Sequence, residues 1–350
     1  MKRLTVHLVI AYLSWGSICH AQMTFTTNLT SNSAANVSFA QAADTWASEF
    51  RDDITVNLQY GFVDMDDGTV ATASSGIHSV QYTEFWDAIG NDITTAHDST
   101  MFNGLPTGTS FSVYINQTRE ASGAAFEIPY VDNDGGANNS NVFLSAANAK
   151  ALGLFAPHAE SVDGFVMFNN SYDWDFDPSD GIEMDHLDFY GTAMHEIGHT
   201  LGFQSGVDNL DANGDGQFSD NDFPYVTSLD FLRFSTASEL AGADIDWTAD
   251  SRAKYFSIDG GLTSVIGGSE HWSTGLNYGD GEQASHWKDG VNLGIMDPTT
   301  NFGLVNSISS VDLIAFDVIG YDRGLTAVPE PGGFAGMLAL GIFVLRRRRS

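Results

Sequence analysis

Cysteine is almost absent from this sequence. Among 350 residues only Cys19 occurs, and it lies in an N-terminal stretch that we expect to be cleaved off. The processed chain would then contain no cysteine, which excludes disulfide bonds as stabilising cross-links. Bound metal ions are the expected substitute in a cysteine-free protein.

Basic side chains are also scarce. Residues 22–327 contain 8 Lys and Arg against 44 Asp and Glu, a net charge of −36. Such a surface repels the phosphates of nucleic acids and of anionic membranes, so we expect no nucleic-acid partner. It suits a protein that binds cations. Aspartate outnumbers glutamate 34 to 11, and aspartate is favoured in turns and calcium loops.

Long apolar runs are confined to the two ends of the chain. The basic start Met1-Lys2-Arg3, the largely apolar residues 4–15 and the small Ala21 predict a signal peptide over residues 1–21. Residues 332–345 form a second apolar run, which arginines follow at 346–349. This second run is too short to span a hydrocarbon core of about 30 Å comfortably.

Residues 326–350 resemble a PEP-CTERM sorting signal of Gram-negative bacteria. The Pro329-Glu330-Pro331 motif, the apolar run and the basic end all match that signal. The resemblance implies export across the inner membrane, transient retention there, recognition by an exosortase-type sorting machinery and removal of the tail. The protein would then be secreted or lie at the cell surface. A permanent transmembrane anchor is the alternative.

The chain between the two ends shows no internal repeat and no low-complexity linker, so residues 22–325 are expected to form one domain. Helical spacing of apolar residues predicts helices over 38–50, 82–89, 146–152 and 308–321. Alternating or short apolar runs predict strands over 54–62, 111–115, 142–144 and 164–168. Helices and strands are interspersed without a regular βαβ rhythm, which indicates the α+β class.

Residues 188–203 contain the pattern His195-Glu196-x-x-His199. Two residues four apart lie on one face of a helix, so both imidazoles can reach one metal ion. Glu196 can then act as a general base on a water molecule bound to zinc, and the activated water would attack a carbonyl group. About 0.01 accidental matches are expected in a chain of this composition. The alternative is a pair of surface histidines on an amphipathic helix.

A catalytic zinc needs three protein ligands and one open position. With Gly202 added, the pattern resembles the opening of the metzincin metalloprotease signature, in which a third ligand stands three residues after the glycine. Ser205 occupies that position here and is a poor zinc ligand. Asp208 lies three residues further on and stays open as an alternative, as does His271, which like His286 precedes a tryptophan.

The leishmanolysin-like branch of the metzincins places an insertion after the glycine and supplies the third histidine later. This sequence is similar to that branch, because His286-Trp287 is followed by Met296 and by the closing stretch 308–321. The resemblance implies His286 as the third zinc ligand and Met296 as the residue packed beneath the metal. It also implies a two-lobed, zincin-like domain with a mixed sheet, a methionine turn and an insertion over 206–240.

The predicted strand 164–168 precedes the metal helix in the chain. Extended peptides commonly bind by adding a strand to an exposed sheet edge, so this strand is the expected substrate-binding edge. The alternative is an ordinary core strand.

The stretch 211–222 follows the twelve-residue calcium-loop pattern. Its expected calcium ligands are Asp211, Asn213, Asp215, Gln217 and Asp222. Gly216 occupies the sixth position, and the twelfth is Asp rather than Glu, which shortens the reach of the side chain. An Asp- and Gly-rich solvated turn is the alternative.

Together these patterns predict an exported zinc endopeptidase that acts on protein or peptide substrates, with Zn²⁺ at its active site and Ca²⁺ in a structural loop. A calcium-binding extracellular matrix or surface protein that keeps the fold without catalysis is a second hypothesis. A zinc hydrolase acting on a non-peptide amide is a third.

Overall fold

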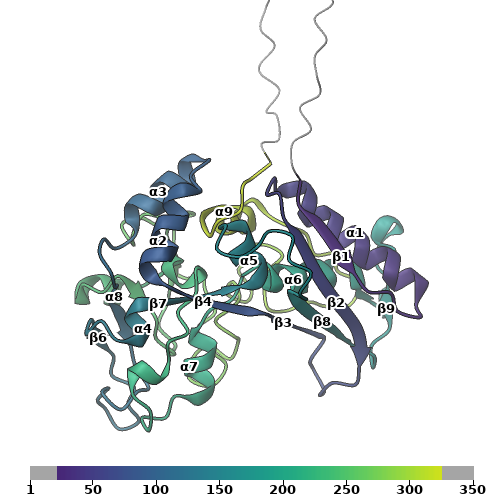
Figure 1. Cartoon of the computed structure of the whole chain (residues 1–350). Helices are drawn as coiled ribbons and strands as arrows, with labels where there is room; N and C mark the ends of the chain where they lie inside the picture. Colours follow the sequence, from purple (N-terminus) through teal and green to yellow (C-terminus); the bar gives the residue numbers. More distant parts are fainter. Residues whose placement is uncertain (1–21, 325–350) are drawn as a thin grey trace, which may run out of the picture.

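The largest sheet of the protein has four strands in the order β1–β2–β8–β3 (Figure 1). The structure is a computed structural model that describes residues 22–324, so the predicted leader and the sorting tail lie outside the described residues. Its strands are β1 (Thr24–Thr27), β2 (Thr55–Val63), β8 (Gly164–Asn169) and β3 (Ala71–Ser75). The first three run parallel and β3 pairs with β8 in the antiparallel direction, so the sheet is mixed.

Two helices, α1 (Ser33–Glu49) and α6 (Phe189–Thr200), cover the same face of this sheet. On α1, the Phe39 ring stacks on Tyr60 of β2 with ring centroids 4.1 Å apart. On α6, the Phe189 ring lies 4.4 Å from that of Phe168 in β8. Burial of each such aromatic ring contributes roughly 1.5–3 kcal/mol. The two helices are therefore fixed to the sheet by aromatic packing.

Most of the remaining elements form smaller sheets and helices to one side of this sheet (Figure 1). The paired strands are β4 (Ile77–Gln81) with β7 (Asn141–Ser145), β9 (Trp174–Asp175) with β10 (Leu187–Asp188), β11 (Arg233–Phe234) with β13 (Tyr255–Phe256), and β5 (Val113–Ile115) between β6 (Tyr130–Asp132) and β12 (Ile245–Asp246). The helices are α2 (Tyr82–Asn91), α3 (Ala96–Gly104), α4 (Ala137–Ser140), α5 (Ala146–Ala151), α7 (Val207–Asn213), α8 (Thr236–Ala241) and α9 (Ser310–Val318). Short 3₁₀ turns are η1 (Pro178–Asp180), η2 (Asp220–Asp222) and η3 (Leu229–Leu232).

The closing helix α9 returns to the centre of the molecule. Its Phe316 packs edge-on against Trp46 of α1, with ring centroids 4.7 Å apart. Just after the helix, the Tyr321 hydroxyl donates a hydrogen bond of 2.7 Å to the carbonyl of Leu201, at the end of α6. Contacts from the C-terminal part of the domain therefore help to hold α6, the helix that carries the metal-binding pattern, in place.

The prediction of an α+β domain is confirmed, and the helices and strands predicted from periodicity are present as α1, α2, α5, α9, β2, β5, β7 and β8. The prediction that residues 164–168 form the exposed edge is wrong, because β8 pairs with β2 on one side and with β3 on the other. The edge strands of this sheet are β1 and β3, and β3 is the neighbour of β8. The sequence of β3, residues 71–75, is Ala-Thr-Ala-Ser-Ser, which lacks the large apolar alternation that marks a strand.

Among residues 22–324, no helix is both long and apolar enough to cross a membrane.

Candidate metal centre

Helix α6 begins and ends through local interactions. The Asp188 side chain caps it by accepting a hydrogen bond of 2.9 Å from the backbone N–H of Gly191. Gly202 follows the end of the helix with φ of +116°, a conformation that favours glycine. The apolar side of the helix, including Ala193 and Ile197, is buried. The opposite side carries the histidines.

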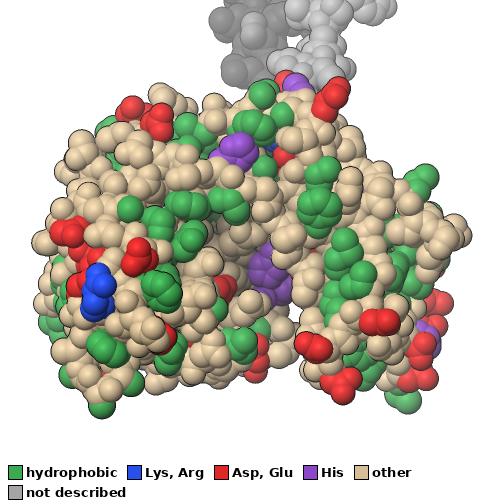
Figure 2. All heavy atoms as spheres, turned by 60° about the horizontal axis from the view of Figure 1, so that its bottom comes forward, with side chains coloured by type: hydrophobic (Ala, Val, Ile, Leu, Met, Phe, Trp, Pro, Cys, Tyr) green, Lys and Arg blue, Asp and Glu red, His purple; other side chains and the backbone are tan. Residues whose placement is uncertain are grey.

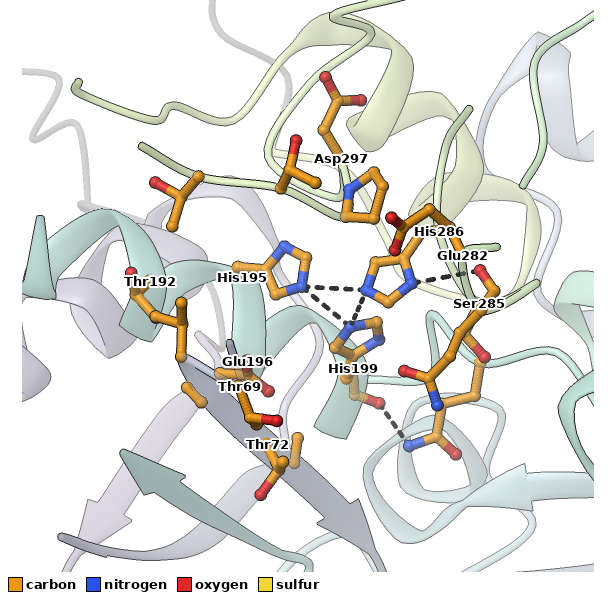
Figure 3. Close-up of a pocket in the computed structure, with 18 of the residues that line it drawn as sticks. Thr69, Thr72, Thr192, His195, Glu196, His199, Glu282, Ser285, His286 and Asp297 are labelled. Atoms are coloured by element: carbon orange, nitrogen blue, oxygen red, sulfur yellow. Dashed lines mark hydrogen bonds between the residues drawn. The ribbon is translucent and has the colours of Figure 1, made fainter. Parts of the chain in front are cut away.

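Three imidazoles converge at one point. His195 and His199 come from α6, and His286 comes from a loop much later in the chain. The Nε2 atom of His199 lies 3.1 Å from that of His195 and 3.1 Å from that of His286, and the third separation is 3.3 Å (Figure 3). Among the described residues, this is the one group of three His, Cys, Asp or Glu side chains whose ligand atoms come this close.

The other ring nitrogens explain why these three atoms face one another. The Nδ1 atoms of His195 and His199 each lie 2.7 Å from a backbone carbonyl oxygen, and that of His286 lies 3.3 Å from one. A carbonyl only accepts, so the hydrogen-bond network assigns the ring proton to Nδ1. Each Nε2 then presents a lone pair, and a cation at their centre would relieve their mutual repulsion.

The spacing fits zinc. A tetrahedral ion with Zn–N distances of 2.0–2.1 Å holds its nitrogen ligands about 3.3 Å apart, close to the separations of 3.1–3.3 Å in the triad. Burial lowers the pKa of His195, takes the pKa of His199 to about 3 and takes that of His286 well below its usual value. All three rings are therefore neutral, as metal ligands must be.

Glu196 lies beside the triad on the same helix and lines the same cleft. It is 5% exposed, and burial raises its pKa to about 8. No hydrogen bond from another described residue reaches its carboxylate. The side chain is therefore available to a molecule in the cleft.

Met296 packs directly beneath the helix. It is completely buried, and a Cβ atom added to Gly198 would lie 2.5 Å from its sulfur. Gly198 stands between the two helical ligands, so glycine is required where the methionine approaches the backbone. The carbonyl of Met296 also accepts a hydrogen bond of 3.0 Å from the N–H of Trp287, next to His286.

Asp312 of α9 was not singled out by sequence reasoning. Its buried carboxylate accepts hydrogen bonds from the Trp287 indole at 2.7 Å and from the backbone N–H of Ile295 at 2.9 Å. It thereby joins the loop of His286 to the loop of Met296. The available signal was the capping pattern Ser309-x-x-Asp312, in which Asp312 accepts from the Ser309 N–H at 2.7 Å.

The two alternative third ligands are engaged in other contacts. In His271, Nδ1 accepts from the N–H of Phe256 at 3.0 Å, and Nε2 lies 2.7 Å from the carbonyl of Gly267. Asp208 accepts hydrogen bonds from the Ala284 N–H at 2.6 Å and from the Ser285 hydroxyl. Neither residue is brought together with His195 and His199. Asp208 instead holds the backbone that leads into His286.

The carboxylate of Asp211 contacts a segment that lies far along the chain. Helix α7 continues to Asn213, and the Asp211 carboxylate is buried against residues 277–278. It accepts hydrogen bonds of 2.8 Å each from the backbone N–H groups of Asn277 and Tyr278. The expected first ligand therefore links two distant segments of protein.

The other expected calcium ligands bond to their own neighbours. Asp215 accepts from the backbone and side chain of Gln217, at 2.9 and 2.8 Å. Asp222 accepts from the Ser219 N–H at 2.9 Å, and Asn213 donates to a carbonyl in its own helix. The structure does not bring these side chains to a common centre. The five calcium ligands and calcium binding itself therefore stay predictions.

The triad opens into a cleft of about 910 Å³. Figure 2 shows histidine side chains in this hollow. Residues 68–75, which include β3, line the cleft together with α6 and the segments 282–286 and 294–300. The triad is therefore accessible from a groove with a strand edge along it.

Comparisons with models of known families, with curated proteins and with solved structures found no match for this chain.

Proposed function

We propose that the protein is a zinc-dependent endopeptidase of the metzincin type, similar to the leishmanolysin-like branch. One observation carries the proposal. Three Nε2 atoms lie within 3.1–3.3 Å of one another beside a carboxylate, and they open into a groove. His195, His199 and His286 would hold the zinc, and their number leaves a coordination position for a reactant.

A zinc ion held by three imidazoles supplies Lewis acidity, which acidifies water and stabilises negative charge on a carbonyl oxygen. Glu196 supplies the proton transfers. Its carboxylate accepts a proton as water attacks the peptide carbonyl and returns that proton to the leaving amine. The hydrogen bonds to the Nδ1 atoms keep the ligands oriented during the reaction.

The groove supports an extended substrate. Strand β3 pairs with β8 on one side only, and it lines the cleft. Its other edge offers main-chain groups with which a peptide can pair. The Gln204 side chain links this strand to the metal helix, because it donates to the Ser75 hydroxyl and to the His199 carbonyl at 2.9 Å each. A peptide on this edge would therefore pass the triad.

We also propose export, on the basis of the signal-peptide pattern and the PEP-CTERM-like tail. A non-catalytic calcium-binding surface protein has less support, because the expected calcium ligands are scattered whereas the histidines converge.

The test is replacement Glu196→Gln, which keeps the size of the side chain and removes its basicity. Cleavage of casein and of a quenched fluorescent peptide should fall about 10²–10⁴-fold, with zinc content unchanged. The matched control is Glu160→Gln, which removes the same charge from an exposed position outside the cleft. Full activity in the Glu196→Gln protein would contradict the proposal.

A further inference from the structure

Five aspartates form a cluster beside the helices α2, α3 and α9. This aspartate cluster consists of Asp52, Asp92, Asp98, Asp317 and Asp322, and none of these residues lines the cleft of the imidazole triad. Burial, and then the charges of the other four, raise the pKa of Asp92 to about 8. Figure 1 shows α2, α3 and α9 side by side, and α3 contacts both of the other helices. Carboxylates from three segments of the chain therefore repel one another at one place in the fold.

Two members of the cluster are buried, and each uses only one of its carboxylate oxygens. Asp98 is 5% exposed, and its Oδ2 accepts hydrogen bonds from the N–H groups of Thr94 and Thr95 at 2.9 and 2.7 Å. Asp317 is 1% exposed, and its Oδ2 accepts a hydrogen bond from the Thr95 hydroxyl at 2.9 Å. The Oδ1 atoms of both residues are buried without a hydrogen-bond partner. Leaving such an atom unpaired is costly, and a bound ion or water is its usual partner.

The rest of the cluster repeats this pattern. The Oδ1 atom of Asp322 is also buried without a partner. Asp92 is the C-cap residue of α2, and Asp317 lies in the last turn of α9. A helix carries a partial negative charge at its C-terminus, where a cation is favoured and a carboxylate is disfavoured. Two of the carboxylates therefore lie where the backbone itself favours a positive charge.

The cationic side chains nearby do not offset the repulsion. Burial, and then the charge of Asp98, raise the pKa of Asp317 to about 6, although Arg323 and His97 act in the opposite direction. Burial likewise raises the pKa of Asp52 to about 7. The charges that act most strongly on Asp92 are all negative. The cluster therefore has the electrostatic character of a cation site.

The donor set favours calcium. Carboxylate oxygens are hard ligands, and Ca²⁺ takes about six to eight oxygens in a flexible geometry, whereas Mg²⁺ demands a tight octahedron. No three of these carboxylates have oxygens within 4.8 Å of one another, in contrast to the ligand atoms of the triad. Water would therefore complete the shell, and the affinity should be modest, with Kd of about 10⁻⁴–10⁻³ M as in extracellular calcium modules.

We propose that the aspartate cluster binds one calcium ion, held chiefly by Asp92, Asp98 and Asp317, and that this ion joins α2 and α3 to α9. Helix α9 packs against α1, and Tyr321 after it holds the end of α6. Calcium in the cluster therefore stabilises the part of the domain that supports the metal helix. The inference is independent of the proposed peptidase function, and the site is separate from segment 211–222.

The first test measures calcium binding to purified, zinc-loaded protein carrying Glu196→Gln, which prevents self-digestion and serves as the reference protein. Isothermal titration calorimetry with calcium chloride should show binding with Kd of about 10⁻⁴–10⁻³ M. In calcium-free buffer, addition of about 10 mM calcium should raise Tm by about 3–8 °C. Magnesium should produce less than about half of this shift. Sodium chloride at matched ionic strength should produce less than about 1 °C, because it only screens the charges.

The second test removes one charge at a time. Asp92→Asn in the reference protein removes a carboxylate that the described residues do not hydrogen-bond. In calcium-free buffer this variant should be at least as stable as the reference protein, because repulsion is relieved. Its calcium-induced shift in Tm should nevertheless fall below about 1 °C. Asp317→Asn should lose the calcium-induced shift as well.

Two controls remove a charge from exposed positions outside the cluster. Asp66→Asn and Asp215→Asn should both keep the full calcium-induced shift, and the second variant separates the cluster from segment 211–222. No shift in the reference protein, or a shift that both Asp92→Asn and Asp317→Asn preserve, would overturn the inference. A shift that sodium chloride reproduces would also overturn it, because screening alone would then explain the stabilisation.

Discussion

The imidazole triad and the aspartate-rich segment 211–222 differ in where their polar atoms find partners. In the triad, backbone carbonyls engage the Nδ1 atoms and leave three Nε2 atoms facing one another. In segment 211–222, the carboxylates accept hydrogen bonds from nearby protein N–H groups. Both regions are rich in potential ligands. A metal site forms where other contacts orient the ligands toward a common centre.

The difference has a structural origin. The two helical histidines are placed by the geometry of a single helix that packs against the sheet and against α1. In segment 211–222, helix α7 runs on to Asn213 and turns Asp211 toward residues 277–278. The Asp211 carboxylate is thus occupied by hydrogen bonds within the protein.

The largest expected effect comes from removing the third imidazole. His286→Ala should reduce bound zinc well below one equivalent and abolish peptide cleavage, because two imidazoles cannot fill the expected ligand set. Metal analysis and the peptide assay would measure this. His271→Gln is the matched control, and it should retain zinc. Zinc loss in His271→Gln with retention in His286→Ala would exchange the roles of the two residues.

The next effect concerns the packing under the triad. Gly198→Ala would place a methyl group against the Met296 sulfur, where a Cβ lies 2.5 Å away. Overpacking should lower the free energy of unfolding by about 1–3 kcal/mol and weaken zinc binding. Urea unfolding and a zinc titration would show it. The double variant Gly198→Ala/Met296→Ala should recover part of the loss. Unchanged stability and zinc affinity in the Gly198→Ala protein would mean that the contact between Gly198 and Met296 is unimportant.

Segment 211–222 should respond to protein contacts more than to calcium. Asp211→Asn weakens the acceptor of two backbone N–H groups and should cost about 1–3 kcal/mol in calcium or in EGTA. Asp215→Asn, at an exposed position, should stay within about 0.5 kcal/mol of the unchanged protein. Thermal unfolding with and without calcium measures both. Calcium-dependent stabilisation that Asp215→Asn abolishes would restore the calcium-loop prediction.

The smallest expected effect concerns the pH dependence of stability. It comes from a third group of aspartates, Asp92, Asp322 and Asp52. Burial, followed by the charge of Asp322 and then of Asp52, raises the pKa of Asp92 to about 8. Because the pKa of Asp92 is higher in the folded protein than in the unfolded chain, the contribution of this group to stability is complete below about pH 4. That contribution is lost as pH rises through about 8. Asp92→Asn should therefore reduce the loss of stability between pH 5 and 9, by about 2–4 °C in Tm.

Thermal scans across that pH range, with Asp66→Asn as an exposed control, would test this. A steeper pH dependence in the Asp92→Asn protein would contradict it.

Sequence reasoning worked where the chemistry is local. The spacing of His195, Glu196 and His199 depends on one helical turn, so the pattern alone indicates their shared site. The assignment of His286 depended on the order of motifs in a known family. Residues that are far apart in the sequence and close in space show no local sequence pattern. Strand β3 was missed because it is short and polar, and its role depends on its pairing with β8. Asp312 was missed because its role depends on the buried Trp287 indole that it contacts.

The most direct measurement is X-ray absorption spectroscopy at the zinc edge on the purified, zinc-loaded protein, compared with its His286→Ala variant. The account predicts three imidazole nitrogens near 2.0–2.1 Å and one oxygen in the unchanged protein, with one imidazole fewer in the variant. A zinc shell with two imidazoles in both proteins, or no zinc at all in the unchanged protein, would contradict it.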